Sequence, residues 1–211
     1  MTSVEEDRTD EQRTRWFTSD LHFGHVNILS YCSRPFANVE EMNDALISAW
    51  NETVAPADEV WVLGDVAMGR LDVTLSNVGR LNGQLRLLVG NHDRPFDMTG
   101  DALRRWEARY IDAGFTSIHH GAVTLEIDAV EVVLSHFPYT GDSRQEDRFV
   151  VHRPADTGGW LLHGHVHEVW RQQERMVNVG VDAWGGRPVS EQTVADLIAA
   201  GPAELPPLPW R

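Results

Sequence analysis

The chain contains 211 residues, 42% hydrophobic and 24% charged, a composition typical of a soluble globular protein that can bury one sizeable core. Its formal net charge of −14 argues against broad nucleic-acid binding, because contact with a phosphate backbone requires a basic surface. A small phosphorylated substrate is compatible with this charge if bound metal ions supply positive charge locally.

Cys32 is the only cysteine, which excludes an internal disulfide and suits a reducing compartment. We interpret it as a small buried hydrophobe. Residues 1–15 are polar and acidic and lack the apolar core of a signal peptide. No segment has the length and apolar character of a membrane span. These features predict a cytoplasmic protein without a membrane partner.

Hydrophobic patterning divides the chain into three parts. It predicts a single folded domain over residues 14–201. Residues 1–13 lack periodicity and are expected to form a flexible arm. Residues 202–211 form a proline-rich tail, for which packing or fraying is favoured over a role as a polyproline ligand.

The first half of the domain alternates predicted strands and helices. Strands are expected at residues 16–19, 59–63 and 85–89, with helices at 39–53 and 71–81. Each predicted strand runs directly into polar residues, and ligands of α/β sheets bind beyond the carboxyl ends of the strands. These polar segments are Asp20-Leu21-His22, Gly64-Asp65 and Gly90-Asn91-His92-Asp93.

The second half is richer in predicted strands, one of which ends at His136. Residues 140–159 form a long polar loop, which we interpret as a lid or substrate loop, with surface disorder nearly as well supported. The other expected elements are a helix at residues 101–113, hairpins over 116–134, strands at 160–162 and 176–181, and a helix at 190–200 that Ser190 caps.

Three histidines, His163, His165 and His167, follow the strand at 160–162 around a glycine that lets the backbone turn. Neutral imidazole is the commonest metal ligand, so this turn indicates a metal site. The strand ends together supply eight oxygen and nitrogen donors: Asp20, His22, Asp65, Asn91, His92, His136, His165 and His167. Such donors suit manganese, iron or zinc, and eight are too many for one ion. A two-metal site bridged by a carboxylate is therefore favoured.

The ordered motifs resemble those of the calcineurin-like metallophosphoesterases, especially the small phage and bacterial members. The resemblance covers residues 14–182 and rests on Asp20-x-His22, Gly64-Asp65, Gly90-Asn91-His92-Asp93, His136 and Gly164-His165-x-His167. It implies an α/β fold, a four-layer α/β/β/α sandwich of two mixed sheets flanked by helices.

The resemblance also implies roles for these residues. One divalent metal would be bound by Asp20, His22, Asp65 and His167, and the other by Asp65, Asn91, His136 and His165, with Asp65 as the bridge. Manganese is the favoured ion, with iron, zinc and nickel as alternatives. A hydroxide between the metals would attack the phosphorus of a phosphate ester. His92 would stabilise the developing charge and protonate the leaving group.

Several residues do not follow from the resemblance. Some family branches orient the catalytic histidine with an aspartate shortly after the Gly-Asp pair, and none follows Asp65 at that place, which leaves Asp93 as a possible partner for His92. His163 is expected to support the ligands rather than bind metal. The remaining candidates are His25, which would line the pocket, and Arg34 and Arg94, which would bind substrate phosphate or, equally well supported, form surface ion pairs.

The function that these observations favour is hydrolysis of phosphate esters, with phosphodiesters or nucleotides preferred over other monoesters as small-molecule substrates. Two alternatives are a catalytically silent member that uses the fold to bind a partner, and a metal-storage domain. The filled ligand set argues against the first, and His92 beside Asn91 argues against the second, because storage needs no acid. The sequence provides no basis for an oligomeric state.

Overall fold

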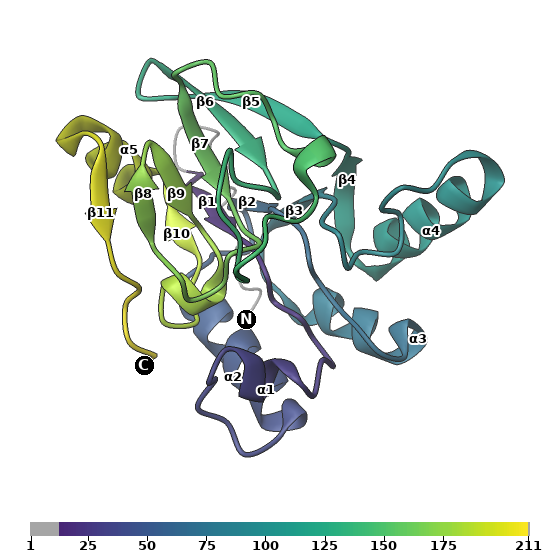
Figure 1. Ribbon diagram of the computed structural model, residues 1–211. Helices are drawn as coiled ribbons and strands as arrows, with labels where there is room; N and C mark the ends of the chain where they lie inside the picture. Colours follow the sequence, from purple (N-terminus) through teal and green to yellow (C-terminus); the bar gives the residue numbers. More distant parts are fainter. Residues whose placement is uncertain (1–12, 211) are drawn as a thin grey trace, which may run out of the picture.

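Two mixed β-sheets pack face to face in the computed structural model, which describes residues 13–210 (Figure 1). Nearly all of the predicted arm over residues 1–13 lies outside the described residues. In the first sheet the order is β10-β1-β2-β3-β4, with β1 to β4 parallel and β10 antiparallel. Its strands are β1 (Arg15–Thr18), β2 (Glu59–Val62), β3 (Gln84–Leu88), β4 (Phe115–His119) and β10 (Val189–Ser190).

The second sheet has the order β11-β8-β9-β7-β6-β5, and β6, β7 and β9 run parallel to one another. Its strands are β5 (Ala122–Ile127), β6 (Val130–Ser135), β7 (Trp160–His163), β8 (Gln172–Glu174), β9 (Met176–Asn178) and β11 (Ala203–Leu205). The helices are α1 (Ile28–Tyr31), α2 (Val39–Asn51), α3 (Leu71–Thr74), α4 (Gly100–Ala113) and α5 (Glu191–Ala200). The expected fold of two mixed sheets flanked by helices is confirmed.

β2 shows how the sequence builds the two cores of the molecule. Successive side chains of a strand point to opposite faces, so an unbroken apolar run is buried on both sides. Val60 and Val62 join the core beneath the helices, which includes Trp50 of α2 and Tyr110 of α4. Trp61 contributes to the second core, between the sheets, as does Leu63 just beyond the strand. α5 contacts both sheets, through β1, β10 and β5.

Capping and turn residues fix the helix boundaries. α2 begins where the Asn38 side chain accepts the amide hydrogen of Glu41, and α5 begins where Ser190 accepts that of Thr193, as predicted for Ser190. The helix predicted at residues 71–81 is instead a short α3 followed by a 3-10 helix over Leu75–Arg80. Within residues 13–210, the elements that the sequence did not predict are α1, β8, β10, β11 and the 3-10 helices over Val150–His152 and Val181–Ala183, all of four residues or fewer.

The proline-rich tail is packed rather than frayed. β11 pairs antiparallel with β8, and Leu208 bridges to Trp184. The half-buried Trp210 ring then packs edge-on against Phe36, with centroids 5.4 Å apart. The tail therefore covers part of the helix-side core.

Replacing this terminal aromatic ring tests the packing of the tail. Trp210→Ala is expected to lower the free energy of unfolding by about 1–3 kcal/mol, because it removes a large apolar surface from the core. Urea denaturation would measure the change, with Tyr31→Ala as a control because that ring is 64% exposed. Equal stability of the two variants would contradict a packed tail.

Candidate metal centre

The predicted ligands gather at one edge of the sandwich, where parallel strands of both sheets end (Figure 1). The first sheet provides Asp20, His22, Asp65 and Asn91 beyond β1, β2 and β3. The second sheet provides His136, His165 and His167 beyond β6 and β7. The two sheets are joined at this edge. Ser19 forms an isolated parallel β-bridge with Gly180, and the His165 amide donates to Asp20 Oδ2 at 3.0 Å.

Five of these seven residues have left-handed backbone conformations, which are uncommon outside glycine. Their φ angles are 59° for Asp20, 52° for His22, 58° for Asp65, 70° for His165 and 52° for His167. Strained backbone persists only where surrounding structure enforces it, and it concentrates at functional sites. Here it turns consecutive ligands inward from loops that leave buried strands.

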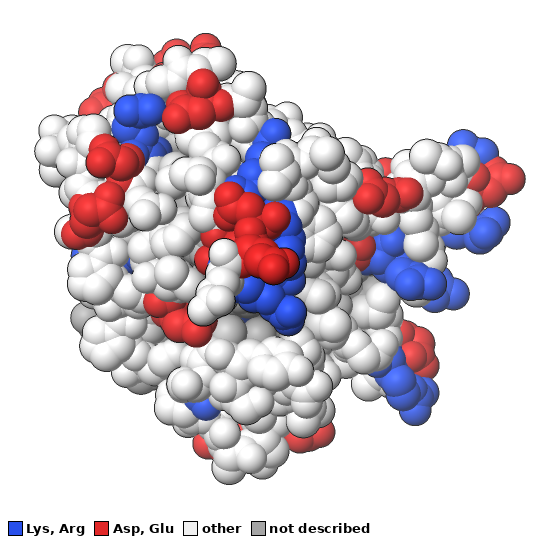
Figure 2. All heavy atoms as spheres, viewed as in Figure 1, with Lys and Arg blue, Asp and Glu red and all other residues white. Residues whose placement is uncertain are grey.

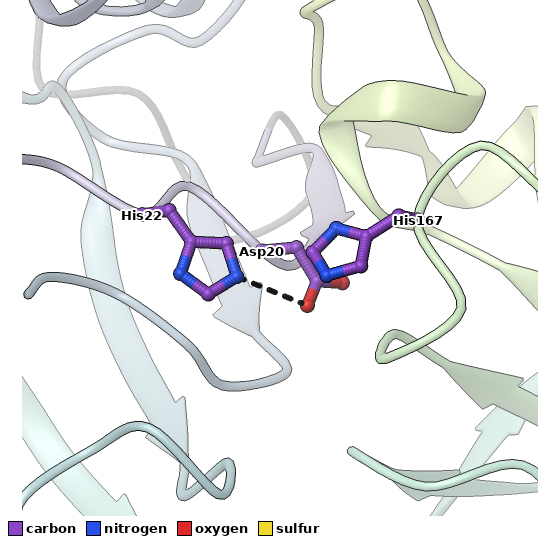
Figure 3. A group of neighbouring side chains, drawn as sticks. All are labelled: Asp20, His22 and His167. Atoms are coloured by element: carbon purple, nitrogen blue, oxygen red, sulfur yellow. Dashed lines mark ion pairs between the residues drawn. The ribbon is translucent and has the colours of Figure 1, made fainter. Parts of the chain in front are cut away.

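The first group of donors is Asp20, His22 and His167, which offer ligand atoms within 4.8 Å of one another. Figure 3 shows the Asp20 carboxylate beside the two imidazoles, whose centroids lie 5.2 Å apart. His22 Nε2 is 3.9 Å from Asp20 Oδ1. Neither atom has a hydrogen-bond partner among the described residues, although both are buried. Buried polar atoms are normally paired, so these two fit a site for a cation.

Asp65 lies between this group and a second one. Its Oδ2 is 3.6 Å from His22 Nε2 and 3.6 Å from His136 Nε2. Asn91 Oδ1 completes the second group, at 3.0 Å from His136 Nε2 and 2.9 Å from His165 Nδ1. The structure therefore brings all seven predicted ligands together, with the Asp65 carboxylate in the middle.

The hydrogen bonds of the histidines determine which ring nitrogen faces the centre. The acceptors place the imidazole hydrogen of His136 on Nδ1, which donates to the Leu63 carbonyl at 2.7 Å. In the neutral ring Nε2 then presents a lone pair toward two oxygen acceptors, those of Asp65 and Asn91. Converging lone pairs repel unless a cation lies among them. The donor set therefore fits a bound divalent metal.

Two acidic residues outside the ligand set hold the other histidines in the same way. Asp142 Oδ2 accepts from His165 Nε2 at 3.1 Å, and Asp182 Oδ2 accepts from His167 Nδ1 at 3.0 Å. Such outer partners fix the tautomer and the orientation of metal-binding histidines. Neither residue was predicted from the sequence. Asp182 follows β9 and so carries the same strand-end signal as the ligands, whereas Asp142 lies in a loop without periodicity.

Burial and crowding of carboxylates shift the pKa values of this centre. Burial, together with the nearby Asp20 charge, raises the pKa of Asp65. Burial lowers the pKa of His136, and burial with the neighbouring His136 lowers that of His165 to about 3. Burial acts downward on His167 as well, but the Asp20 carboxylate and the Asp182 hydrogen bond raise its pKa well above the usual value.

Asp93 was a candidate to orient His92, but the structure gives its carboxylate another role. It accepts amide hydrogens from Asp65 at 2.9 Å, Val66 at 3.0 Å and Gly90 at 2.9 Å. The buried Asp93 side chain therefore joins the ligand loops that follow β2 and β3. Burial and the Asp65 charge raise its pKa to about 6.

His92 lies on the rim of the centre, where its side chain is exposed. Its ring is edge-on to His22, with centroids 5.4 Å apart, and no hydrogen bond from another described residue reaches it. Desolvation by surrounding protein atoms, then the neighbouring His136, lowers its pKa to about 4. His92 and His25 both line a cavity of about 370 Å³ that opens above the ligands.

The two arginines expected to bind substrate are not in this cavity. Arg34 is buried, and its guanidinium pairs with both oxygens of Asp182 at 2.8 Å. Its remaining donors reach the carbonyls of Leu21 and Asp20, so a substrate role does not fit its placement. Arg94 is exposed, with its guanidinium 5.6 Å from the Trp106 ring centroid and outside the cavity lining. Neither arginine faces the substrate side.

His163 and Gly164 support the ligand turn from below. His163 is buried and donates from Nδ1 to the Gly164 carbonyl at 2.7 Å. It contacts Trp170 rather than the ligands, in agreement with the expected supporting role. A Cβ at Gly164 would lie 2.5 Å from Asp20 Oδ2 and closer still to Ser19, so only glycine fits where the two sheets meet.

Cys32 is buried beside the centre, as expected for a small hydrophobe. Its sulfur, His167 and Asp182 could also surround an ion. Burial raises the pKa of this thiol to about 11, however, and Asp182 is already paired with Arg34. This group is therefore charge-balanced without a metal.

Comparison with known proteins defines the class to which this fold and site belong. A family model described as the calcineurin-like phosphoesterase superfamily domain matches residues 16–197. The chain therefore belongs to the calcineurin-like phosphoesterase superfamily, which confirms the resemblance found in the sequence.

Particular relatives come from two mycobacterial phages. The Gene 66 protein of Mycobacterium phage L5 is 37% identical over 200 residues, covering 87% of this chain and 93% of that protein. The Gene 66 protein of Mycobacterium phage D29 is 39% identical over 181 residues, covering 80% and 88%. A solved structure of a protein of unknown function from Aquifex aeolicus has a TM-score of 0.65 at 22% identity, covering 87% of this chain and 98% of that one. That last likeness bears on the fold alone.

The helices of residues 13–210 include none long and apolar enough to cross a lipid bilayer.

Removing the buried guanidinium tests the structural assignment of Arg34. Arg34→Met is expected to lower the free energy of unfolding by about 3–5 kcal/mol, because Asp182 would remain as a buried charge without its partner. The exposed Arg94→Met should change it by less than about 0.5 kcal/mol. Urea denaturation measures both. A raised KM with unchanged stability of Arg34→Met would instead indicate substrate contact.

Acid titration of the metal-free protein tests the same ion pair. Burial alone would raise the pKa of Asp182, but the Arg34 charge and the hydrogen bond from His167 lower it to about 2. A folded-state pKa below the unfolded value of about 3.9 stabilises the protein above that pH. This contribution should be lost as the pH falls from about 4 toward 2. The Arg34→Met variant should lose stability at higher pH, as measured by circular dichroism.

Proposed function

We propose that the protein is a dinuclear metal-dependent phosphoesterase that acts on phosphodiesters or nucleotides. The observation that carries this proposal is the convergence of lone pairs from the seven ligands into two groups that share Asp65. Membership of the calcineurin-like phosphoesterase superfamily supports a metal-dependent hydrolase of phosphate esters. The finer assignment of two ions and of this substrate class is our inference from the residues.

The two groups would bind the ions as the sequence motifs imply. Asp20, His22, Asp65 and His167 would hold one, and Asp65, Asn91, His136 and His165 the other. When bound, the ions would polarise the phosphoryl oxygens and lower the pKa of an attacking water. We favour manganese, with iron, zinc or nickel as alternatives, because the ligands are imidazole nitrogens and carboxylate or amide oxygens.

His92 is the proposed general acid. Like His25, it lies beside the ligands, lines the cavity and has a ring free of hydrogen bonds from the described residues. His92 alone of the two follows a ligand directly, and its backbone amide donates to Asp65 Oδ1 at 2.8 Å. In the free protein its lowered pKa keeps the imidazole neutral at pH 7. The negative charge of a bound phosphate ester would raise that pKa, since an anion favours imidazolium. His92 could then donate its proton to the leaving oxygen.

Hydrolysis of a chromogenic diester tests this function. The manganese-loaded protein is expected to cleave bis-p-nitrophenyl phosphate faster than p-nitrophenyl phosphate and to lose this activity with a chelator. His92→Ala should lower kcat about 10²–10⁴-fold, because it removes the acid. Manganese binding by calorimetry should be unchanged in this variant, whereas Asp65→Asn should weaken it.

Equal, metal-independent background on both esters would refute a hydrolytic function. Faster cleavage of the monoester would retain the hydrolase and overturn the preference for diesters.

A further inference from the structure

The loop between β6 and β7, residues 136–159, is fastened to the metal centre. Asp142 of this loop accepts from His165 Nε2 at 3.1 Å and, within the loop, from the Arg148 guanidinium at 2.7 Å and the Arg148 amide at 3.0 Å. Phe149 lies edge-on to His165, with ring centroids 5.5 Å apart, and stacks on Phe137. The position of the loop relative to the ligands is therefore fixed by a buried carboxylate and by aromatic contacts.

This attachment places two arginines on the wall of the cavity above the ligands. Ser143, Arg144 and Arg148 line it together with His22 and His92. Figure 2 shows basic and acidic side chains side by side in the middle of this face, where the loop lies. The arginines that line the cavity are therefore Arg144 and Arg148, and not the Arg34 and Arg94 predicted from the sequence.

The two arginines differ in what they already bind. Arg148 uses Nε and Nη2 on Asp142 and Ser143. Arg144 is exposed, and its backbone amide donates to Asp142 Oδ1 at 3.3 Å. Within residues 13–210 no carboxylate or carbonyl pairs with the Arg144 guanidinium. It is available to a ligand as a planar fork of donors, the geometry that suits phosphate and carboxylate.

The charge around the cavity favours an anion at this wall. The chain carries a net charge of −14, so its surface as a whole repels anions. Among residues 13–210, Glu168 is the only acidic side chain that lines the cavity. Arg144, whose guanidinium has no acidic partner among the described residues, therefore provides the local positive charge that would draw an anionic ligand toward the centre, and Arg148 adds donors beside it although Asp142 balances its charge.

The size of the cavity indicates a ligand larger than one phosphoryl group. Its volume of about 370 Å³ is within the range of small-molecule sites, which begins near 300 Å³. Tyr31 lines it too, with a ring that is 64% exposed and can pack against an organic group. A phosphoryl group over the metal ligands would leave room for a second anionic group near the loop.

We propose that Arg144 and Arg148 form a second anion-binding site, which selects phosphoesters that carry a further anionic group, such as nucleoside diphosphates or dinucleotides. The selection among esters rests on the proposed hydrolytic function, but the binding site itself does not. Asp142 is a positioning residue in this arrangement, because its carboxylate accepts hydrogen bonds from Arg144, Arg148 and His165 and so fixes the two arginines relative to the metal ligands.

Calorimetric binding of ADP and AMP to the manganese-loaded protein tests the site. ADP has a second phosphoryl group to reach Arg144, and AMP does not. Arg144→Met is expected to raise the Kd of ADP about tenfold, the loss expected for one charge-assisted contact, and to leave that of AMP within about twofold. Arg144→Glu should weaken ADP further, and Arg144→Lys should restore part of the affinity. Arg105→Met is the matched control, since Arg105 is an exposed arginine on α4 away from the cavity.

Parallel hydrolysis of bis-p-nitrophenyl phosphate by the wild-type protein separates this inference from the proposed function. Weaker ADP binding by Arg144→Met without any hydrolysis would refute the hydrolase and support the second anion site. Hydrolysis by the wild type with ADP affinity equal in wild type, Arg144→Met and Arg144→Glu would overturn the second anion site. Equal losses for ADP and AMP would also overturn it, because Arg144 would then contact the first phosphoryl group.

Discussion

The repulsion among converging lone pairs is the constraint on which the structure depends. Asp20, Asp65 and the inward nitrogens of four histidines are packed at one sheet edge with few hydrogen donors among them. Such a cluster is unfavourable without a cation, so the surrounding fold must hold it together. Buried strands of both sheets, the left-handed turns after them and the Asp93 carboxylate provide that support.

The outer residues of the centre are organised by charge as well as by shape. Each of His136, His165 and His167 directs one nitrogen inward because the other donates to a carbonyl or carboxylate. Two of these acceptors are in turn paired with arginines, Asp142 with Arg148 and Asp182 with Arg34. The two ion pairs thus have different roles: one is structural and the other lies at the cavity wall. All the guanidinium nitrogens of Arg34 are bonded inside the protein, whereas Arg148 also lines the cavity.

Much of the fold and the ligand set could be predicted because both depend on local patterns. Apolar runs such as the one ending at Leu63 are readable as buried strands, and Asp65 follows directly from the strand. The features that could not be predicted depend on contacts between residues that are far apart in the sequence. The Arg34 guanidinium pairs with Asp182, 148 positions away, and the sequence around either residue gives no indication of this ion pair. β11 was missed because its pairing with β8, rather than its composition, makes it a strand.

Each group of ligands takes residues from both sheets, and this has a consequence for the stability of the whole chain. Asp20 and His167, for example, belong to the same group although they come from the first and second halves of the chain. An ion bound there would act as a reversible cross-link that closes a very long loop, much as a disulfide would. Because the chain has a single cysteine and so no internal disulfide, the two metal ions would take over this cross-linking role. Metal binding would then stabilise the packing of the two sheets, and mutations that weaken this packing would lower the affinity for metal.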